Sequence, residues 1–417
     1  MQINHSEKEN PNEQSNQEVD FAGNGWYDVL SLAACSNSDS NTGDTTNTDT
    51  NNTTDNNTTT GDTIKVGALF NITGGQASLD EPGYRAFQLY FDELNAAGGI
   101  NGRQVEVVSY DGKTDQTTCA TNTSKLIDVD EVVAIGGLSD SNYAFSAGNV
   151  AQEAGVPFVF SGATTPTLAS IGDQVFLTAF GDDTCAYAAA DYVTEVMGLT
   201  KVYMLVDQSM EFTTTLASCF QERLEANGGE VVMTDNYMNK DPDFSAQIDR
   251  YLNDNGGAEI LFFSSTPDDI GTIVKQFRDK GVTEPMISGD GADTPLLMEV
   301  GGTASEGVLV STHCSFENED PVVQDFVTLY TETQGTAPEN AFAALGYDCA
   351  HVIATAIEMC GDDVTPANIR DNLEQIQDLR CVTGVISYDA ENHVPQKSAT
   401  IIQVEDGAFK FVQEINP

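Results

Sequence analysis

The chain has 417 residues, and its 65 Asp and Glu against 17 Lys and Arg give a formal net charge of −48. Nucleic acids and anionic membranes are excluded as direct partners, because their phosphates would be repelled. A chain of this length buries a large core and most naturally forms two domains. The acidity leaves two explanations open: adaptation to high salt, or an acidic extracellular protein whose charge aids solubility.

Residues 1–35 form an atypical leader that ends in Leu32-Ala-Ala-Cys35. Small residues before a cysteine resemble a bacterial lipobox, in which Cys35 is lipidated and becomes the mature N-terminus. A secretory leader has a basic start and about 7–15 apolar residues, whereas residues 1–28 carry several acidic side chains against the single Lys8. Two interpretations therefore stay open: a lipoprotein leader with an altered start or another export route, or a disordered polar tail with an incidental cysteine.

Residues 36–62 consist almost entirely of Ser, Asn, Thr, Asp and Gly. Such a segment has nothing apolar to bury, so it predicts a disordered, solvated linker. A linker between an anchored cysteine and a folded body suits a receptor held at the outer face of a cell membrane. No segment of the chain reaches the roughly 18 apolar residues that a membrane span requires.

The folded body begins with a strand, helix, turn, strand unit. The apolar run Ile64–Phe70 predicts a strand, and an apolar stripe over Pro82–Leu94 has the spacing of an amphipathic helix. Gly98 and Gly99 supply the left-handed conformation that ends a helix, and the run from Val105 to Tyr110 predicts the next strand.

The rest of the chain alternates strands with helices, which predicts parallel sheets covered by helices on both faces. The strands are continuous apolar runs, as strands covered on both faces should be. The predicted strands are 132–135, 157–160, 201–206, 230–233, 259–263 and 285–288, and the predicted helices are 141–154, 185–197, 213–226, 244–253 and 268–280.

Eight cysteines include Cys35, so the folded body holds an odd number of seven. None forms a Cys-x-x-Cys motif and the four histidines are scattered, so we expect no metal site and no cofactor. In an oxidising compartment the pairing we favour is Cys360 with Cys381; the alternative is a set of buried thiols.

Three segments together carry a family resemblance: Glu93–Arg103 at the end of the first helix, Ser288–Gly291, and Phe342–Asp348. This combination resembles the leucine/isoleucine/valine-binding family, the branched-chain amino acid receptors of ABC importers, from about residue 62 to near the C-terminus. The resemblance implies an α/β fold of two doubly wound parallel-sheet lobes joined by a three-segment hinge, the type I periplasmic-binding-protein fold. It places lobe 1 at residues 63–181 plus 313–392 and lobe 2 at residues 182–312 plus 393–417.

In open parallel sheets, ligands bind beyond the carboxyl ends of the strands. The loop after the strand 132–135 carries Ser139, Asp140 and Ser141 and opens a helix. These side chains either cap the helix or contact the ligand. Asp140 departs from the family, which has a small hydroxyl residue or glycine there, and a carboxylate would repel an anionic ligand unless it meets a ligand cation.

The next loop, Ser161–Pro166, resembles a family element in which a backbone amide and a threonine hydroxyl bind the ligand's α-carboxylate. The resemblance gives these roles to Gly162 and Thr164, with Ala163 between them in the same loop. The alternative is a turn made rigid by Pro166.

In lobe 2, Asp290 lies on a glycine-flanked turn directly after a strand. The resemblance makes it the acceptor of the ligand's ammonium, and such a charge-assisted contact is stronger than a neutral hydrogen bond. Phe212 and Thr266 stand where the family can have tyrosines, and Phe212 is alternatively a core residue. The loop after the first strand offers Gln76 to Leu79 instead of an aromatic residue.

These features predict a monomeric, non-enzymatic receptor that binds a branched-chain or other apolar amino acid and docks on the membrane subunits of an ABC permease. An amide or urea-like solute stays open because of Asp140. A ligand sensor is the second hypothesis, disfavoured because no kinase or membrane helix follows Gln413–Pro417. An enzyme is disfavoured because the chain has no Gly-x-Ser-x-Gly, P-loop, His-Glu-x-x-His or Gly-x-Gly-x-x-Gly motif.

Overall fold

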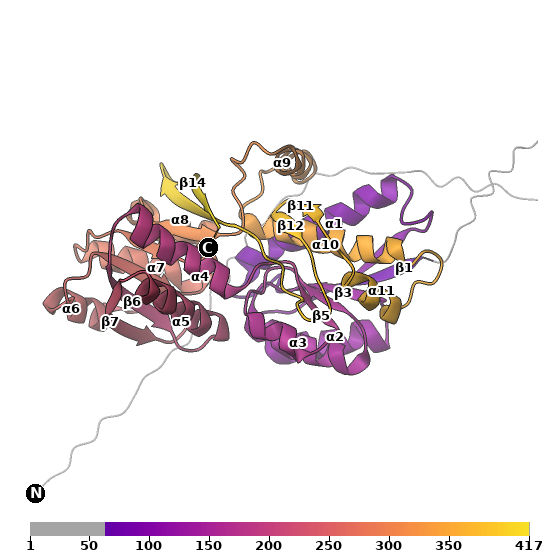
Figure 1. Cartoon of the computed structure of the whole chain (residues 1–417), viewed down its shortest axis with the longest axis horizontal. Coiled ribbons are helices and arrows are strands. Elements are labelled where there is room, and N and C mark those ends of the chain that lie inside the picture. Colours follow the sequence, from indigo (N-terminus) through magenta and orange to yellow (C-terminus); the bar gives the residue numbers. More distant parts are fainter. Residues whose placement is uncertain (1–62, 417) are drawn as a thin grey trace, which may run out of the picture. The chain divides into compact units, whose positions relative to one another are not determined.

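The computed structural model describes residues 63–416. The leader 1–35 with Cys35 and the linker 36–62 lie outside the described residues. Two large sheets organise the described part of the chain, each covered by helices on both faces (Figure 1).

The first sheet has the strand order β2-β1-β3-β4-β5, and all of its strands are parallel. On one face α1, α10 and α11 pack against it, and on the other face α2 and α3. Its strands are β1 (Ile64–Phe70), β2 (Val105–Asp111), β3 (Ala134–Gly137), β4 (Phe158–Phe160) and β5 (Val175–Leu177). Its helices are α1 (Ala77–Ala96), α2 (Gln116–Asp128), α3 (Ser141–Ala154), η1 (Pro166–Ile171), α9 (Pro321–Gln334), α10 (Ala341–Met359) and α11 (Pro366–Leu373).

The second sheet has the order β14-β13-β10-β9-β8-β6-β7. Helices α4 and α5 cover one face, and α6, α7 and α8 cover the other. Its strands are β6 (Lys201–Asp207), β7 (Glu230–Tyr237), β8 (Ile260–Ser264), β9 (Met286–Ser288), β10 (Leu309–Thr312), β13 (Ala399–Glu405) and β14 (Ala408–Ile415). Its helices are α4 (Asp182–Asp191), η2 (Tyr192–Val196), α5 (Glu211–Ala226), α6 (Ser245–Asn253), α7 (Pro267–Asp279), η3 (Asp290–Ala292), α8 (Pro295–Gly301) and η4 (Gly302–Ser305).

The chain passes between the two sheets three times: after β5, after β10, and after the small hairpin of β11 (Leu379–Cys381) and β12 (Gly384–Ile386). The two-lobe α/β fold predicted from the sequence is therefore present. The boundaries proposed for lobe 1 and lobe 2 at single-residue level stay a prediction.

The second sheet is not wholly parallel, because β13 runs antiparallel to both β10 and β14. The turn between β13 and β14 contains Asp406 and Gly407, both with positive φ (53° and 74°). An Asp-Gly dipeptide between two strand-forming runs is a strong hairpin signal, and the sequence analysis missed it.

Helix α1 begins five residues before the predicted Pro82, at Ala77. Proline has no N–H to bond the carbonyl four residues earlier. Here the carbonyl of Ser78 accepts instead from Asn340 Nδ2 at 2.8 Å. This substitute bond allows the helix to start early, and so brings the first turn of α1 to the cleft described below.

Two local predictions need correction. Strand β3 ends two residues later than predicted, at Gly137, where φ is 135° and a Cβ would lie 1.9 Å from the carbonyl oxygen of Leu69. The predicted disulfide is wrong: all seven cysteines of the described residues are free. Cys360 Sγ bonds the carbonyl of Ala356 within its own helix, while Cys381 Sγ faces His351 Nδ1.

Candidate functional site

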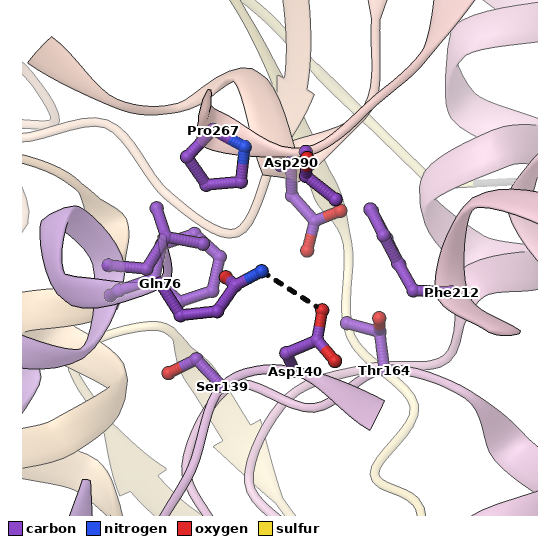
Figure 2. A pocket seen from close by; sticks show the side chains of 11 residues that line it. Gln76, Ser139, Asp140, Thr164, Phe212, Pro267 and Asp290 are labelled. Atoms are coloured by element: carbon purple, nitrogen blue, oxygen red, sulfur yellow. Dashed lines mark hydrogen bonds between the residues drawn. The ribbon is translucent and has the colours of Figure 1, made fainter. Parts of the chain in front are cut away.

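The carboxyl ends of strands from both sheets face one small cavity. The space left free inside it is little more than one water molecule occupies, so its walls lie close together in this structure. Figure 2 shows Asp140 of lobe 1 and Asp290 of lobe 2 on opposite sides of the cavity. The lining residues are Gln76, Leu79, Ser139, Asp140, Thr164, Phe212, Thr266, Pro267, Asp290, Gly291 and Phe342.

Asp140 is the N-cap of α3 and is only 5% exposed. Its carboxylate accepts from the backbone N–H of Asn142 at 2.9 Å and from Gln76 Nε2 at 3.2 Å. Burial raises the pKa of Asp140 to about 7, opposed by the bond from Asn142 and reinforced by the negative charges of Asp80 and Asp207. Asp140 therefore both caps the helix and faces the cavity.

Ser139 lines the cavity beside a second buried carboxylate, Asp80 of α1. Asp80 accepts from the backbone N–H of Asn71 at 2.7 Å. Burial raises the pKa of Asp80 to about 6, and a hydrogen bond from the Ser139 side chain partly offsets this rise. The Ser139 hydroxyl also lies 3.5 Å from that of Ser161.

In the loop after β4, only Thr164 reaches the cavity. The backbone N–H of Gly162, which the resemblance assigns to a ligand carboxylate, lies 3.3 Å from the carbonyl of Leu138 and donates to it. Ala163 is buried in the hydrophobic core beneath α3. Ser141 Oγ accepts from the backbone N–H of Thr165 at 3.2 Å, so it ties this loop to α3 and does not line the cavity.

Gly162 is needed here for close packing. A Cβ at this position would lie 2.6 Å from the ring of Phe342 and 2.8 Å from Ser139 Oγ. Both of these neighbours line the cavity. Gly162 thus sets the shape of the site without contacting its contents.

Asp290 opens η3 directly after β9 and is 2% exposed. Its Oδ2 lies 3.0 Å from Nε2 of His313, a buried residue that follows β10. Burial lowers the pKa of His313, although the nearby Asp290 opposes this, so the imidazole is neutral near pH 7 and donates one hydrogen bond. The contact with His313 thus fixes the position of the Asp290 carboxyl group.

The remaining walls of the cavity are largely apolar. Phe212 comes from the first turn of α5, and Phe342 from the first turn of α10. Thr266 Oγ1 accepts a hydrogen bond from Asn239 Nδ2 at 2.6 Å. The site thus combines charged ends with an apolar middle.

Three lining residues were not predicted as contacts: Pro267, Gly291 and Phe342. Gln76 and Leu79 were named as what the loop after the first strand offers, and they reach the cavity from the start of α1. Pro267 and Gly291 directly follow the predicted Thr266 and Asp290, so extending each loop by one residue would have found them. Phe342 belongs to a segment that served only to mark the family resemblance.

Direct contacts join the two lobes around the cavity. The side-chain oxygen of Asn142 accepts from the backbone N–H of Glu211 at 2.8 Å. The hydroxyl of Thr294 donates to that of Ser78 at 2.9 Å. The structure is therefore that of a closed cleft.

A small cavity between two lobes, with opposed carboxylates and apolar walls, defines a solute-binding protein. Within residues 63–416, no group of His, Cys, Asp and Glu side chains is arranged to hold a metal ion. None of the helices described is long and apolar enough to cross a membrane.

Comparison with known proteins identifies the family. The model of the periplasmic binding protein family matches residues 63–408, and the chain belongs to this family. The Leu/Ile/Val-binding protein homolog 3 of Brucella melitensis is 26% identical over 82% of this chain and 92% of its own length. The leucine-, isoleucine-, valine-, threonine- and alanine-binding protein of Pseudomonas aeruginosa is 22% identical over 82% of this chain and 90% of its own.

Solved structures agree with this assignment. The leucine-binding protein LivK of Thermotoga maritima superposes with a TM-score of 0.80 at 28% identity, covering 85% of this chain and 99% of that one. The substrate-binding protein LivJ of Streptococcus pneumoniae, in complex with isoleucine, gives 0.80 at 28% identity over 85% and 100%. The fold is the type I periplasmic-binding fold, and these relatives are binding proteins, not enzymes.

Proposed function

We propose that this chain is the extracellular receptor of an ABC importer. In this proposal its lobes close on a branched-chain or other apolar amino acid, or on a close derivative of one, and the closed form delivers the solute to a membrane permease. The receptor acts as a monomer and is tethered to the outer face of the membrane through a lipid on Cys35. The branched-chain amino acid-binding relatives support the solute class.

The observation that carries the proposal is the position of Asp290. It reaches from lobe 2 into a closed cavity whose walls include Leu79, Phe212 and Phe342. A solute with an ammonium group and an aliphatic side chain satisfies both features, because the cation pairs with the carboxylate and the side chain leaves water. Exclusion of water from the closed cleft strengthens the ionic contact.

Closure requires differential contacts between the open and closed states. The Asn142–Glu211 and Ser78–Thr294 hydrogen bonds join opposite lobes, so they exist only in the closed form. A bound solute that contacts both Asp140 and Asp290 favours the same form.

An amide or urea-like solute is the second candidate ligand. The observation that favours it is Asp140, a carboxylate that suits an N–H donor better than a ligand carboxylate. A ligand-sensing receptor with the same site is the alternative to import.

Calorimetric titration and thermal shift of the full chain test the proposal. The panel is Leu, Ile, Val, Ala, Phe, Glu and Arg, the amides and amines of the apolar members, and urea. A solute at 100 times its dissociation constant adds about 2.7 kcal/mol of stability. We expect a response to amine-bearing solutes with apolar side chains, lost in Asp290→Asn and retained in Asp128→Asn, a matched change at an exposed position at the end of α2.

A silent panel, or binding that survives Asp290→Asn unchanged, would contradict the proposed site. Uptake of the bound solute by cells separates import from sensing. An importer predicts that removal of this chain abolishes uptake of the labelled solute, whereas a sensor predicts unchanged uptake.

A further inference from the structure

The cavity is lined by acidic side chains and by no basic ones. Its lining includes two carboxylates, Asp140 and Asp290, and no Lys, Arg or His side chain. Two more buried carboxylates stand behind it: Asp80, next to Ser139, and Asp182, which accepts from Thr165 Oγ1 at 2.8 Å. The neutral His313 is bonded to Asp290 and adds no positive charge. An anionic group placed in this cavity would face carboxyl groups from both lobes and no basic side chain.

Two backbone N–H groups that could hold a ligand carboxylate in lobe 1 are already used by the protein. A helix N-terminus attracts anions, but at α3 the backbone N–H of Asn142 is bonded to the chain's own Asp140. The backbone N–H of Gly162 is bonded to Leu138. The carboxylate of Asp140 thus occupies the end of α3 that would otherwise attract an anion.

An independent observation points to the group that belongs there. Gln76 is 4% exposed and lines the cavity. Its Nε2 donates to Asp140, which fixes the amide (Figure 2), while its Oε1 is buried without a hydrogen-bond partner. A buried acceptor without a donor costs free energy, and a donor on the solute removes this cost.

From this arrangement we infer that the solute presents a nitrogen donor to Asp140 and to Gln76 Oε1, in addition to the ammonium that meets Asp290. The ligand class is an amino amide or a short diamine with an apolar side chain, and not a free amino acid. This inference rests on the proposed receptor function and specifies its substrate.

The opposing possibility is that a protonated Asp140 donates to a ligand carboxylate. The titratable groups around Asp140 are Asp80 on α1, Tyr143 on α3, Asp207 at the end of β6 and Asp290 across the cavity, and none of them is basic. The two possibilities predict opposite changes of affinity with pH. Affinity for a nitrogen donor rises as pH rises and Asp140 loses its proton, whereas affinity for a carboxylate rises as pH falls.

Three probes with the same side chain make the test: L-leucine, L-leucinamide and 4-methylpentane-1,2-diamine, which differ only in the group that replaces the carboxylate. Each is titrated calorimetrically into the full chain at pH 5, 6 and 7, below the pKa of about 7.7–8.0 of the α-amino group of an amide, so that the ammonium stays protonated. We expect the amide or the diamine to bind at least tenfold more tightly than leucine, with a preference that grows from pH 5 to pH 7. Tighter binding of the amide would identify a neutral nitrogen donor beside Asp140, and tighter binding of the diamine a cationic one.

Asp140→Ser removes the charge and keeps an N-cap, so it should fold as the wild type does in circular dichroism. In this variant the preference should shift toward leucine by tenfold or more. Tightest binding of leucine by the wild type, with the same order in Asp140→Ser, would overturn the inference and leave the receptor function intact. If neither protein binds any probe or any member of the wider panel, both the inference and the proposed function fail.

Discussion

Asp290 owes its orientation to a histidine from the segment that connects the two lobes. His313 follows β10, where the chain leaves the second sheet, and its ring lies 4.1 Å from that of Phe180, near the first crossing. The imidazole of His313 therefore contacts both Asp290, which faces the cavity, and Phe180. It joins the Asp290 carboxyl group to two of the segments that connect the lobes. Any rearrangement of these segments on opening must move or break this contact.

Gly162 offers a test at the scale of a single residue. Gly162→Ala should push its Cβ against Phe342 and Ser139, because the built distances of 2.6 and 2.8 Å are too short. We expect a loss of stability of about 1–3 kcal/mol from overpacking, together with weaker solute binding, measured by urea unfolding and calorimetry.

Gly198→Ala serves as its control. Gly198 has φ of 68° and nothing within 4 Å of a built Cβ, so the change introduces backbone strain of roughly 1 kcal/mol without crowding the cavity. Its affinity for solute should stay that of the wild type. Equal affinities for both variants would show that Gly162 does not shape the site.

The sequence indicated the position of the site through the loops that follow strands. Ser139, Asp140 and Thr164 in lobe 1, and Phe212, Thr266 and Asp290 in lobe 2, line the cavity. Their contacts with a ligand stay predictions. Ser141, Gly162 and Ala163 lie in the same loops but face other protein groups. A linear pattern identifies a loop, but the direction of each side chain depends on packing between distant segments.

At the scale of elements, α1 shows how a distant contact changes a helix boundary. The apolar stripe predicts a helix only from Pro82 onward. Asn340 supplies the missing hydrogen bond to Ser78 from a position far along the chain. This contact could not be predicted without the fold, so Gln76 and Leu79 were placed in a loop, whereas Gln76 caps α1 and Leu79 belongs to it. Helix α3, whose predicted bounds were correct, begins at Ser141 with a local Asp140 cap.

Helices α3 and α5 meet across the cleft through Asn142, which allows a test of closure. Asn142→Ala removes the hydrogen bond to Glu211, which exists only when the lobes are closed. A net value of about 0.5–1.5 kcal/mol for such a bond predicts roughly 2- to 10-fold weaker solute binding. Calorimetry measures the affinity, and urea unfolding checks that stability without solute is little changed.

Asn149→Ala is the matched change on the same helix, since Asn149 is exposed and bonds only the carbonyl of Phe145 within α3. It should leave solute affinity unaltered. Equal affinity of Asn142→Ala and Asn149→Ala would argue against a role for the interlobe bond in closure.

At the scale of the whole molecule, the net charge of −48 predicts a dependence of stability on salt. Like charges on a compact body repel, and raising the ionic strength from 0.01 to 0.1 M shortens the Debye length from about 30 to about 10 Å. The melting temperature should therefore rise steeply over this range of NaCl. A flat profile would contradict a role for charge repulsion in the stability of the fold.

Buried carboxylates predict a dependence on pH as well. Burial raises the pKa of Asp140 and Asp293 to about 7, and of Asp80 and Asp269 to about 6. Between the ordinary Asp pKa near 3.8 and these values, the folded state binds more protons than the unfolded state. Stability from these groups is therefore present at low pH and is lost as pH rises through 6 to 7.

Urea unfolding without solute should give a higher midpoint at pH 5 than at pH 8. Asp140→Asn should flatten this dependence, because one of the groups responsible is gone, whereas Asp128→Asn should not change the slope. A midpoint that increases from pH 5 to pH 8 would contradict the assignment of these carboxyl groups as buried and destabilising when ionised.

Asp140 and Asp290 come from opposite lobes yet face the same cavity. With nothing between them, their repulsion opposes closure, and it grows as water leaves the cleft. A positively charged solute reverses the sign of this force by acting as a shared counter-ion. Under the proposed function, the two carboxylates would therefore favour an open cleft without solute and a closed cleft with a cationic solute bound.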